Sequence, residues 1–188
     1  MGYKTRNSYP GSDAHVSSRC INYQKSHHLK RKNIKKMFIS VVNEANQKYN
    51  FKLINYCIMN NHFHMVIHIP KNGDTLSVIM QFIKSVFAKR YNKATKRTGP
   101  FWNERYTEKI IQLQDQPIYY FHCLMWYIFN NPVKANLVEN PEEYKFSAIK
   151  HYLNKNYKDG IDIYRHKYFL QLGNTHEERL KKFLKYKE

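Results

Sequence analysis

Two short apolar segments, Phe51–Ile58 and His62–Ile69, follow each other with only the turn 59–61 between them. Each segment has the length and the residue types of a strand, so the pair predicts a β-hairpin. Apolar residues recur at helical spacing on either side of it, from about Arg31 to Tyr49 and from the capping residue Thr75 to about Asn92. A hairpin set between amphipathic helices indicates a mixed fold rather than an all-helical one.

Shorter segments continue the alternation. A strand is expected within Ala14–Tyr23 and another at Arg105–Leu113, and the helical segment Gln116–Asn131 should end at Pro132. Strands separated by helices around a central hairpin predict an α+β fold, with the helices packed on one face of the sheet.

The sequence contains no internal repeat and no low-complexity linker, so we expect one domain. Residues 1–13 are polar and rich in turn-forming residues, which predicts a loose N-terminal arm. Residues 14–188 form the expected domain, with a helical C-terminal extension from about residue 148. Two further helical stretches are expected, at Lys134–Val138 and Glu177–Tyr186.

The charge of the chain points to a polyanionic partner. Lysine and arginine total 32 against 14 acidic residues, which gives a formal net charge of +18. Nucleic acid is the first expectation and an anionic membrane the second. Aromatic residues make up 15% of the chain, which favours nucleic acid because aromatic rings stack on unpaired bases.

No run of 18 or more apolar residues predicts a membrane span, and the polar N-terminus lacks the apolar core of a signal peptide. The three cysteines, Cys20, Cys57 and Cys123, are far apart and form no CxxC pair. Reduced, mostly buried thiols in a cytoplasmic protein fit this pattern.

The second strand of the hairpin carries a histidine pair. Side chains alternate along a strand, so His62 and His64 share one face while Phe63 and Met65 share the other. Two imidazoles on an otherwise apolar strand cost desolvation unless they find partners, and a metal ion is one such partner. A structural role is the alternative. His68 has the same parity but lies further along the strand, and we expect it to be peripheral.

A second pair of residues offers a candidate metal ligand and a candidate nucleophile. Tyr127 and Asn131 are four residues apart, so both face the same side of a helix. An amide oxygen suits Mg²⁺ or Mn²⁺, and a tyrosine beside such a metal could attack a phosphodiester. The alternative is a core tyrosine before a helix-stopping Asn-Pro. Weaker pairs of the same spacing are Tyr23 with His27 and Tyr152 with Asn156.

Taken in order, these motifs resemble the REP-associated tyrosine transposases, a family of single-strand transposases with a His-hydrophobic-His motif. The similar blocks are Ala14–Arg19, Cys57–Val66, Phe101–Tyr106, Tyr127–Ala135 and Leu137–Ser147, so the likeness covers roughly Ala14 to Ser147. Asn136 replaces the glycine usual after the Pro-Val-basic-Ala run, and Phe146-Ser147-Ala148 replaces the usual Trp-Ser-Ser. Neither departure touches the proposed chemistry.

The resemblance implies a ferredoxin-like antiparallel sheet with helices packed on it. It also implies that His62, His64 and Asn131 bind a divalent metal, Mg²⁺ or Mn²⁺, and that Tyr127 is the nucleophile. The implied reaction forms a 5′-phosphotyrosine, releases a 3′-hydroxyl and reseals by reversal. The implied partners are single-stranded or hairpin DNA such as repetitive extragenic palindromes, bound in the cytoplasm at the nucleoid by a monomer or a homodimer.

DNA contacts are expected from two basic runs, Lys25–Lys36 and Lys84–Lys109. The second run interleaves cations with aromatic residues, and we expect contacts from Lys89, Arg90, Trp102 and Arg105. Two other functions stay open at this point. A non-catalytic or domesticated nucleic-acid-binding protein would explain the charge, and a metal-dependent ribonuclease or phosphoesterase would explain the charge and the histidines.

Overall fold

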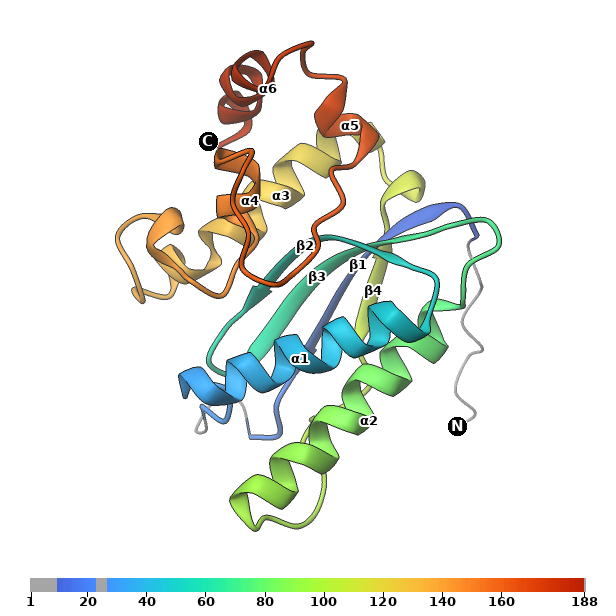
Figure 1. Cartoon of the computed structure of the whole chain (residues 1–188), viewed down its shortest axis with the longest axis vertical. Coiled ribbons are helices and arrows are strands. Elements are labelled where there is room, and N and C mark those ends of the chain that lie inside the picture. The colour runs from blue at the N-terminus through green and yellow to red at the C-terminus, as the bar shows by residue number, and fades with distance from the viewer. Residues whose placement is uncertain (1–9, 23–26, 188) are drawn as a thin grey trace.

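The computed structural model describes residues 10–22 and 27–187. Its centre is a four-stranded antiparallel sheet in the order β2-β3-β1-β4 (Figure 1). The strands are β1 (Ser12–Arg19), β2 (Lys52–Ile58), β3 (His62–Ile69) and β4 (Thr107–Ile110). With the helices α1 and α2 between them, this order is ferredoxin-like, and the predicted α+β class and central hairpin are confirmed.

The register between β1 and β3 sets which side chains share a face. Arg19 lies opposite His62, Ser17 opposite His64, and Asp13 opposite His68. Because side chains alternate along each strand, one face of the sheet is polar along these two strands. The other face carries apolar residues such as Phe63 and Met65, which are buried.

Helices α1 (Lys32–Lys48) and α2 (Leu76–Thr95) cover the apolar face. The ring of Phe38 on α1 lies 4.8 Å from that of Phe63 on β3, and 5.2 Å from that of Phe87 on α2. The hydroxyl oxygen of Thr75 accepts a hydrogen bond from the backbone N–H of Val78, so this residue caps α2 as predicted.

Helix α3 (Pro117–Lys134) packs on the opposite, polar face, against β2 and β3 (Figure 1). The expectation that all helices lie on one face is therefore wrong, because each face of the sheet is covered. Pro132 lies inside α3 and does not end it at Asn131. A proline within the last turn removes one backbone donor, and the helix continues to Lys134. Residues 135–138 are turn and bend, so the separate helical stretch predicted at Lys134–Val138 is wrong.

The C-terminal extension packs on the same side as α3. Phe183 is fully buried, and its carbonyl accepts a hydrogen bond of 2.8 Å from the indole of Trp126 on α3. The backbone N–H of Tyr164 donates to the carbonyl of Leu53 on β2, at 2.8 Å. The short elements outside the sheet core are η1 (Ile111–Leu113), η2 (Pro141–Glu143), α4 (Ile149–Leu153), α5 (Lys167–Leu170), α6 (His176–Phe183) and η3 (Leu184–Tyr186).

Two boundaries differ from the sequence-based expectation. The last strand is only β4, Thr107–Ile110, and the chain turns into η1 where a strand to Leu113 was predicted. Strand β1 begins at Ser12, inside the segment predicted to be an arm, whose residues 1–9 lie outside the described part.

The described helices include none long and apolar enough to cross a membrane. Cys20, Cys57 and Cys123 are free thiols.

Candidate functional site

The polar face of β3 meets helix α3 at a cluster of three rings. His62 and His64 project from β3 with their ring centroids 5.1 Å apart. The ring of Tyr127 on α3 stands edge-on to His64, with centroids 5.7 Å apart. Tyr127 is 45% exposed, so its ring is reachable from solvent and is not a core residue. Tertiary packing thus brings together residues that are far apart in the sequence.

One nitrogen of His62 is fixed by its neighbour in the chain. Nδ1 of His62 lies 2.7 Å from Oδ1 of Asn61, and a carboxamide oxygen only accepts. The proton of the neutral ring therefore sits on Nδ1, and Nε2 keeps its lone pair. Burial, followed by the charge of Arg19, lowers the pKa of His62 to about 4. The neutral ring is the form that binds metals.

His64 is held in a similar way from the neighbouring strand. Its Nδ1 lies 3.0 Å from Nε2 of His15 on β1. Burial, together with the neighbouring His15, His62 and Arg19, lowers the pKa of His64 to about 2. Like His62, this ring is neutral at physiological pH, and its Nε2 has no hydrogen bond among the described residues.

Asn131 lies one helical turn after Tyr127, as the four-residue spacing predicted. Its Nδ2 donates to the backbone carbonyl of Tyr127 at 2.7 Å, which leaves Oδ1 without a hydrogen bond in the described chain. Nζ of Lys134 lies 5.6 Å from the centre of the Tyr127 ring. Two neutral imidazole nitrogens and one amide oxygen are a donor set that fits a divalent cation.

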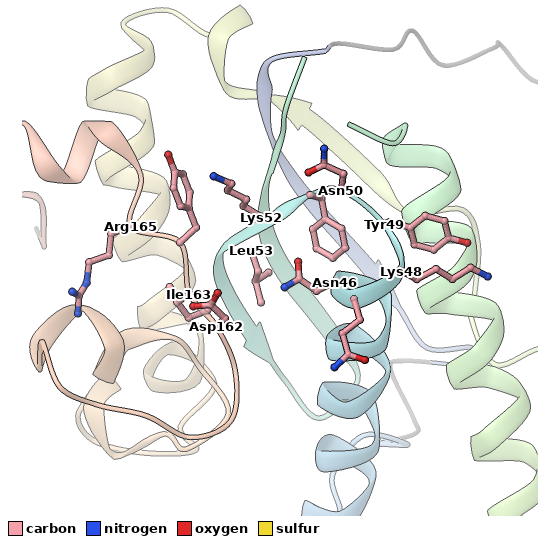
Figure 2. Close-up of a pocket in the computed structure, with 12 residues that line it drawn as sticks. Asn46, Lys48, Tyr49, Asn50, Lys52, Leu53, Asp162, Ile163 and Arg165 are labelled. Carbon is pink, nitrogen blue, oxygen red and sulfur yellow. The ribbon is translucent and has the colours of Figure 1, made fainter. Parts of the chain in front are cut away.

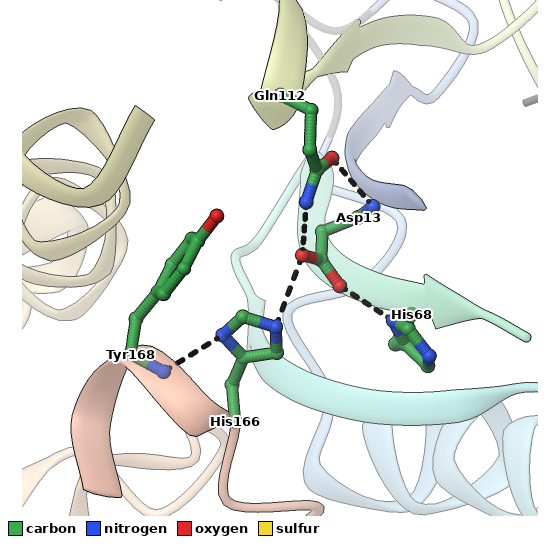
Figure 3. Close-up of polar contacts among 5 residues, drawn as sticks. All are labelled: Asp13, His68, Gln112, His166 and Tyr168. Atoms are coloured by element: carbon green, nitrogen blue, oxygen red, sulfur yellow. Dashed lines mark hydrogen bonds and ion pairs between the residues drawn. The ribbon is translucent and has the colours of Figure 1, made fainter. Parts of the chain in front are cut away.

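A second polar cluster lies further along the same face (Figure 3). Asp13 is 1% exposed, and its two oxygens accept from Nδ1 of His68 at 2.8 Å and from Nε2 of His166 at 3.1 Å. Gln112 donates a third hydrogen bond to it. Burial alone would raise the pKa of Asp13, but the hydrogen bonds from His166, His68 and Gln112 outweigh burial and hold it well below its usual range.

The ligand atoms of Asp13, His68 and His166 lie within 4.8 Å of one another, so this cluster could also hold a metal ion. However, Nδ1 of His166 accepts a hydrogen bond from the backbone N–H of Tyr168, at 3.2 Å. In a neutral ring the proton then sits on Nε2, directed at Asp13 (Figure 3). The cluster is therefore complete as a set of hydrogen bonds. His68, expected to be peripheral, contributes to this buried cluster.

Lys35 on α1 is a buried cation that the sequence analysis assigned to a basic surface run. It is 3% exposed, and its Nζ donates to Oδ1 of Asn60 at 3.0 Å and to the hydroxyl of Tyr144. Burial lowers the pKa of Lys35 to about 8. Lys35 lies three residues before Phe38, on the apolar stripe of its helix. That spacing was the available signal that Lys35 faces the core.

The residues predicted to contact DNA differ in the contacts that they make within the chain. Trp102 packs against the ring of Phe101, with centroids 4.7 Å apart, and its indole donates to the carbonyl of Lys84. Both guanidinium branches of Arg90 pair with Glu44, at 2.5 and 2.8 Å. Lys89 and Arg105 are exposed. Of the first basic run, Lys25 and Ser26 lie outside the described residues.

The weaker tyrosine pairs do not form comparable sites. Tyr152 is fully buried, and its hydroxyl donates to the carbonyl of Ile54 at 2.8 Å. Asn156 follows the end of α4 and is not on the same helix. Tyr23 lies outside the described residues.

A cavity of about 740 Å³ lies between the end of α1, the start of β2 and the C-terminal segment (Figure 2). Its lining consists of Asn46–Leu53 and Asp162–Arg165. None of the predicted site residues lines it, and its walls hold no ring pair comparable to His62 and His64. We therefore infer that the candidate catalytic site is at His62 and His64 and not in this cavity.

Comparison with known proteins shows which family and which fold the chain resembles. The family model "Transposase IS200 like" matches residues 14–119, a range that contains both histidines and ends before Tyr127. A Haemophilus influenzae protein named as a REP-associated tyrosine transposase is 25% identical over 121 residues, which are 60% of this chain and 66% of that protein. The chain therefore matches just under two thirds of the length of this relative.

A solved structure described as a REP-associated tyrosine transposase bound to a REP hairpin superposes with a TM-score of 0.66. The match covers 89% of this chain and 96% of that one, at 19% identity. At that identity the likeness shows a common fold. It extends beyond the range of the family model, so the fold likeness includes much of the segment after residue 119.

Proposed function

This chain belongs to the family of IS200-like transposases, and we propose that it cleaves and rejoins single-stranded DNA through a covalent bond to Tyr127. The observation that carries the proposal is the ring of Tyr127, 45% exposed, standing 5.7 Å from that of His64. A metal-dependent nuclease without a covalent step would not need a tyrosine at this place.

The proposed metal ligands are Nε2 of His62, Nε2 of His64 and Oδ1 of Asn131. Each of these atoms has a lone pair and makes no hydrogen bond among the described residues. The hydrogen bonds of these side chains are made by the other polar atom in each, which is Nδ1 in both histidines and Nδ2 in Asn131. A divalent cation there, Mg²⁺ or Mn²⁺, would supply Lewis-acid polarisation of the scissile phosphate. Lys134, beside the tyrosine ring, adds positive charge where a phosphate would bind.

In the proposed reaction, Oη of Tyr127 attacks the phosphorus and a new P–O bond forms. The bond between phosphorus and the 3′ oxygen breaks, and that oxygen leaves as a hydroxyl after taking up a proton. The phenolic proton passes to solvent. Attack of a 3′-hydroxyl on the phosphotyrosine reverses these steps and reseals the strand, so cleavage and joining need no external energy source.

The proposed substrate is a DNA hairpin with a flanking single strand, such as a repetitive extragenic palindrome. The net charge of +18 supports a nucleic acid partner. The structural relative bound to a REP hairpin has the same fold, which makes a hairpin the first substrate to test.

The deciding experiment incubates the protein with Mn²⁺ and a panel of labelled hairpin oligonucleotides, and looks for a protein–DNA adduct that survives SDS. We expect an adduct that is absent when EDTA replaces Mn²⁺. Cleavage without an adduct would favour a phosphoesterase, and binding without cleavage would favour a non-catalytic DNA-binding protein. Either result would contradict the proposal.

A further inference from the structure

We propose that His15 is the positioning residue for His64. Nε2 of His15 accepts the Nδ1 proton of His64 and so keeps the Nε2 lone pair of His64 directed to the metal. The inference rests on the proposed metal site and goes beyond it, because His15 is not itself a ligand. No motif in the sequence singles out this residue, since its role depends on how β1 pairs with β3.

The contact is close and well oriented. The two nitrogens are 3.0 Å apart, within the range of a normal hydrogen bond. The ring centroids are 5.2 Å apart and the ring planes are inclined by only 23°, so the two rings lie end to end and nearly in one plane, as an N–H···N hydrogen bond requires. The residue directly opposite His64 is Ser17, so His15 reaches it diagonally from the next position on the same face. A hydrogen bond that lies close to the plane of both rings therefore fixes the orientation of the His64 ring.

One proton between two nitrogens has two possible positions. If His64 carries it on Nδ1, then Nε2 of His64 is a free lone pair and can bind a metal. If His15 carries it on Nε2, then Nδ1 of His64 accepts, the proton of the neutral His64 ring sits on Nε2, and that atom cannot bind a metal. His15 thus controls whether His64 is a ligand, provided that His15 carries its own proton on Nδ1.

His62 is held differently. Its partner is Oδ1 of Asn61, at 2.7 Å, which accepts in every protonation state. A ligating histidine usually donates its second N–H to such a partner, and losing that partner costs about 10- to 100-fold in metal affinity. The two proposed ligands therefore differ, because the tautomer of His64 depends on a second histidine while that of His62 does not.

The test compares the Mn²⁺ affinity of the whole free protein, measured by electron paramagnetic resonance, across variants at position 15. His15→Phe keeps an aromatic ring at this position but removes the acceptor, and we expect it to weaken Mn²⁺ binding about 10- to 100-fold. His15→Gln restores an acceptor oxygen near the position of Nε2 and should recover most of the affinity. Ser17→Ala is the matched control on the same strand face, and it should bind like the wild type.

A second readout needs no metal. Nitrogen-15 NMR of the free protein should show His64 as the Nδ1–H tautomer in the wild type and a mixture in His15→Phe. Finding His64 as the Nε2–H tautomer in the wild type would overturn the inference. Equal Mn²⁺ affinity in the wild type and His15→Phe would also overturn the inference, but it would not contradict the metal site itself. If the wild type does not bind Mn²⁺, or if His64→Ala binds it as tightly as the wild type does, the metal site itself is wrong and the role of His15 is contradicted with it. Should His15→Phe not fold, His15→Leu and His15→Gln make the same comparison.

Discussion

The edge of the Tyr127 ring meets the ring of His64 at an interplanar angle of 81°, with centroids 5.7 Å apart. Tyr127 comes from α3 and His64 from β3, and 62 positions of the chain separate them. The relationship exists because α3 packs on the polar face of the sheet and not beside α1 and α2. It puts a solvent-accessible hydroxyl-bearing ring next to two neutral imidazoles.

Replacing Tyr127 with Phe should abolish both adduct and cleavage, because the ring stays but the attacking oxygen is lost. DNA binding and folding should change little, since a single exposed hydroxyl contributes about 1 kcal/mol or less. Gel analysis with SDS and mass spectrometry of the trapped peptide measure this. Tyr119→Phe, exposed on the same helix, is the control. An adduct mapped to Tyr119, Tyr120 or Tyr152 would contradict the assignment.

His62→Ala and His64→Ala should each remove Mn²⁺ binding and cleavage while the protein stays folded, because these rings supply proposed ligands and not core packing. The matched control is His68→Ala, on the same strand and face. His68 bonds to Asp13, so its loss should lower the melting temperature and leave Mn²⁺ affinity unchanged. Titration with Mn²⁺ and thermal unfolding separate the two effects. Strong loss of Mn²⁺ binding in His68→Ala alone would move the metal to the Asp13 cluster.

Asp13→Asn should destabilise the protein by about 1–3 kcal/mol at neutral pH, because a buried carboxylate that accepts hydrogen bonds from His68, His166 and Gln112 is replaced by an amide that cannot accept all three. The folded-state pKa of Asp13 is lowered, so its stabilisation is full above about 3.9, the reference value for an unfolded aspartate, and is lost as the pH falls below it. The difference in unfolding free energy between Asp13→Asn and the wild type should therefore become smaller as the pH falls. Urea unfolding from pH 7 to pH 3 measures it, with the exposed Asp115→Asn as control. A gap that does not change with pH would contradict this account.

Lys35→Met should change how stability depends on pH in the alkaline range. Burial lowers the folded-state pKa of Lys35 to about 8, while an unfolded lysine titrates at about 10.4. Between these values the unfolded chain binds more protons, so this residue makes the wild type more stable as pH rises, by about 3 kcal/mol in all. The variant lacks that rise.

The buried Cys20 thiol has the opposite effect on stability in the same alkaline range. Burial raises the folded-state pKa of Cys20 to about 12, so this thiol makes the protein less stable as the pH rises. The informative quantity is therefore the difference in unfolding free energy between Lys35→Met and the wild type at each pH. Lys36→Met, exposed at the next position, should show no such difference. Parallel curves for the Lys35 variant and the wild type would show that the amine is not held in a lowered-pKa environment.

Two neighbouring cations on α2 should contribute unequally to DNA affinity. Arg90 is paired through both branches with Glu44, whereas Lys89 is exposed. If Lys89 contacts a phosphate, Lys89→Ala should reduce the slope of log affinity against log salt by about 0.7–0.9. Arg90→Ala should reduce it less. Fluorescence anisotropy with a hairpin oligonucleotide across a salt series measures both, and a larger effect of Arg90→Ala would contradict the prediction.

Local sequence patterns were sufficient for much of the fold and for the proposed chemistry. The alternation of side chains along a strand put His62 and His64 on one face, and the four-residue spacing put Tyr127 and Asn131 on one side of a helix. Both patterns depend only on backbone geometry within a single element, so they survive in the folded protein. The central hairpin and both flanking helices were predictable for the same reason.

Tertiary structure decided which elements meet. The β1–β3 register places Asp13 opposite His68 and His15 diagonally from His64, and a shift by one residue would move these side chains to the other face. The packing of α3 on the polar face brings Tyr127 to the histidines, and the C-terminal segment brings His166 to Asp13. These contacts join residues far apart in the chain, and their free energy comes from burial and hydrogen bonds that no local pattern encodes.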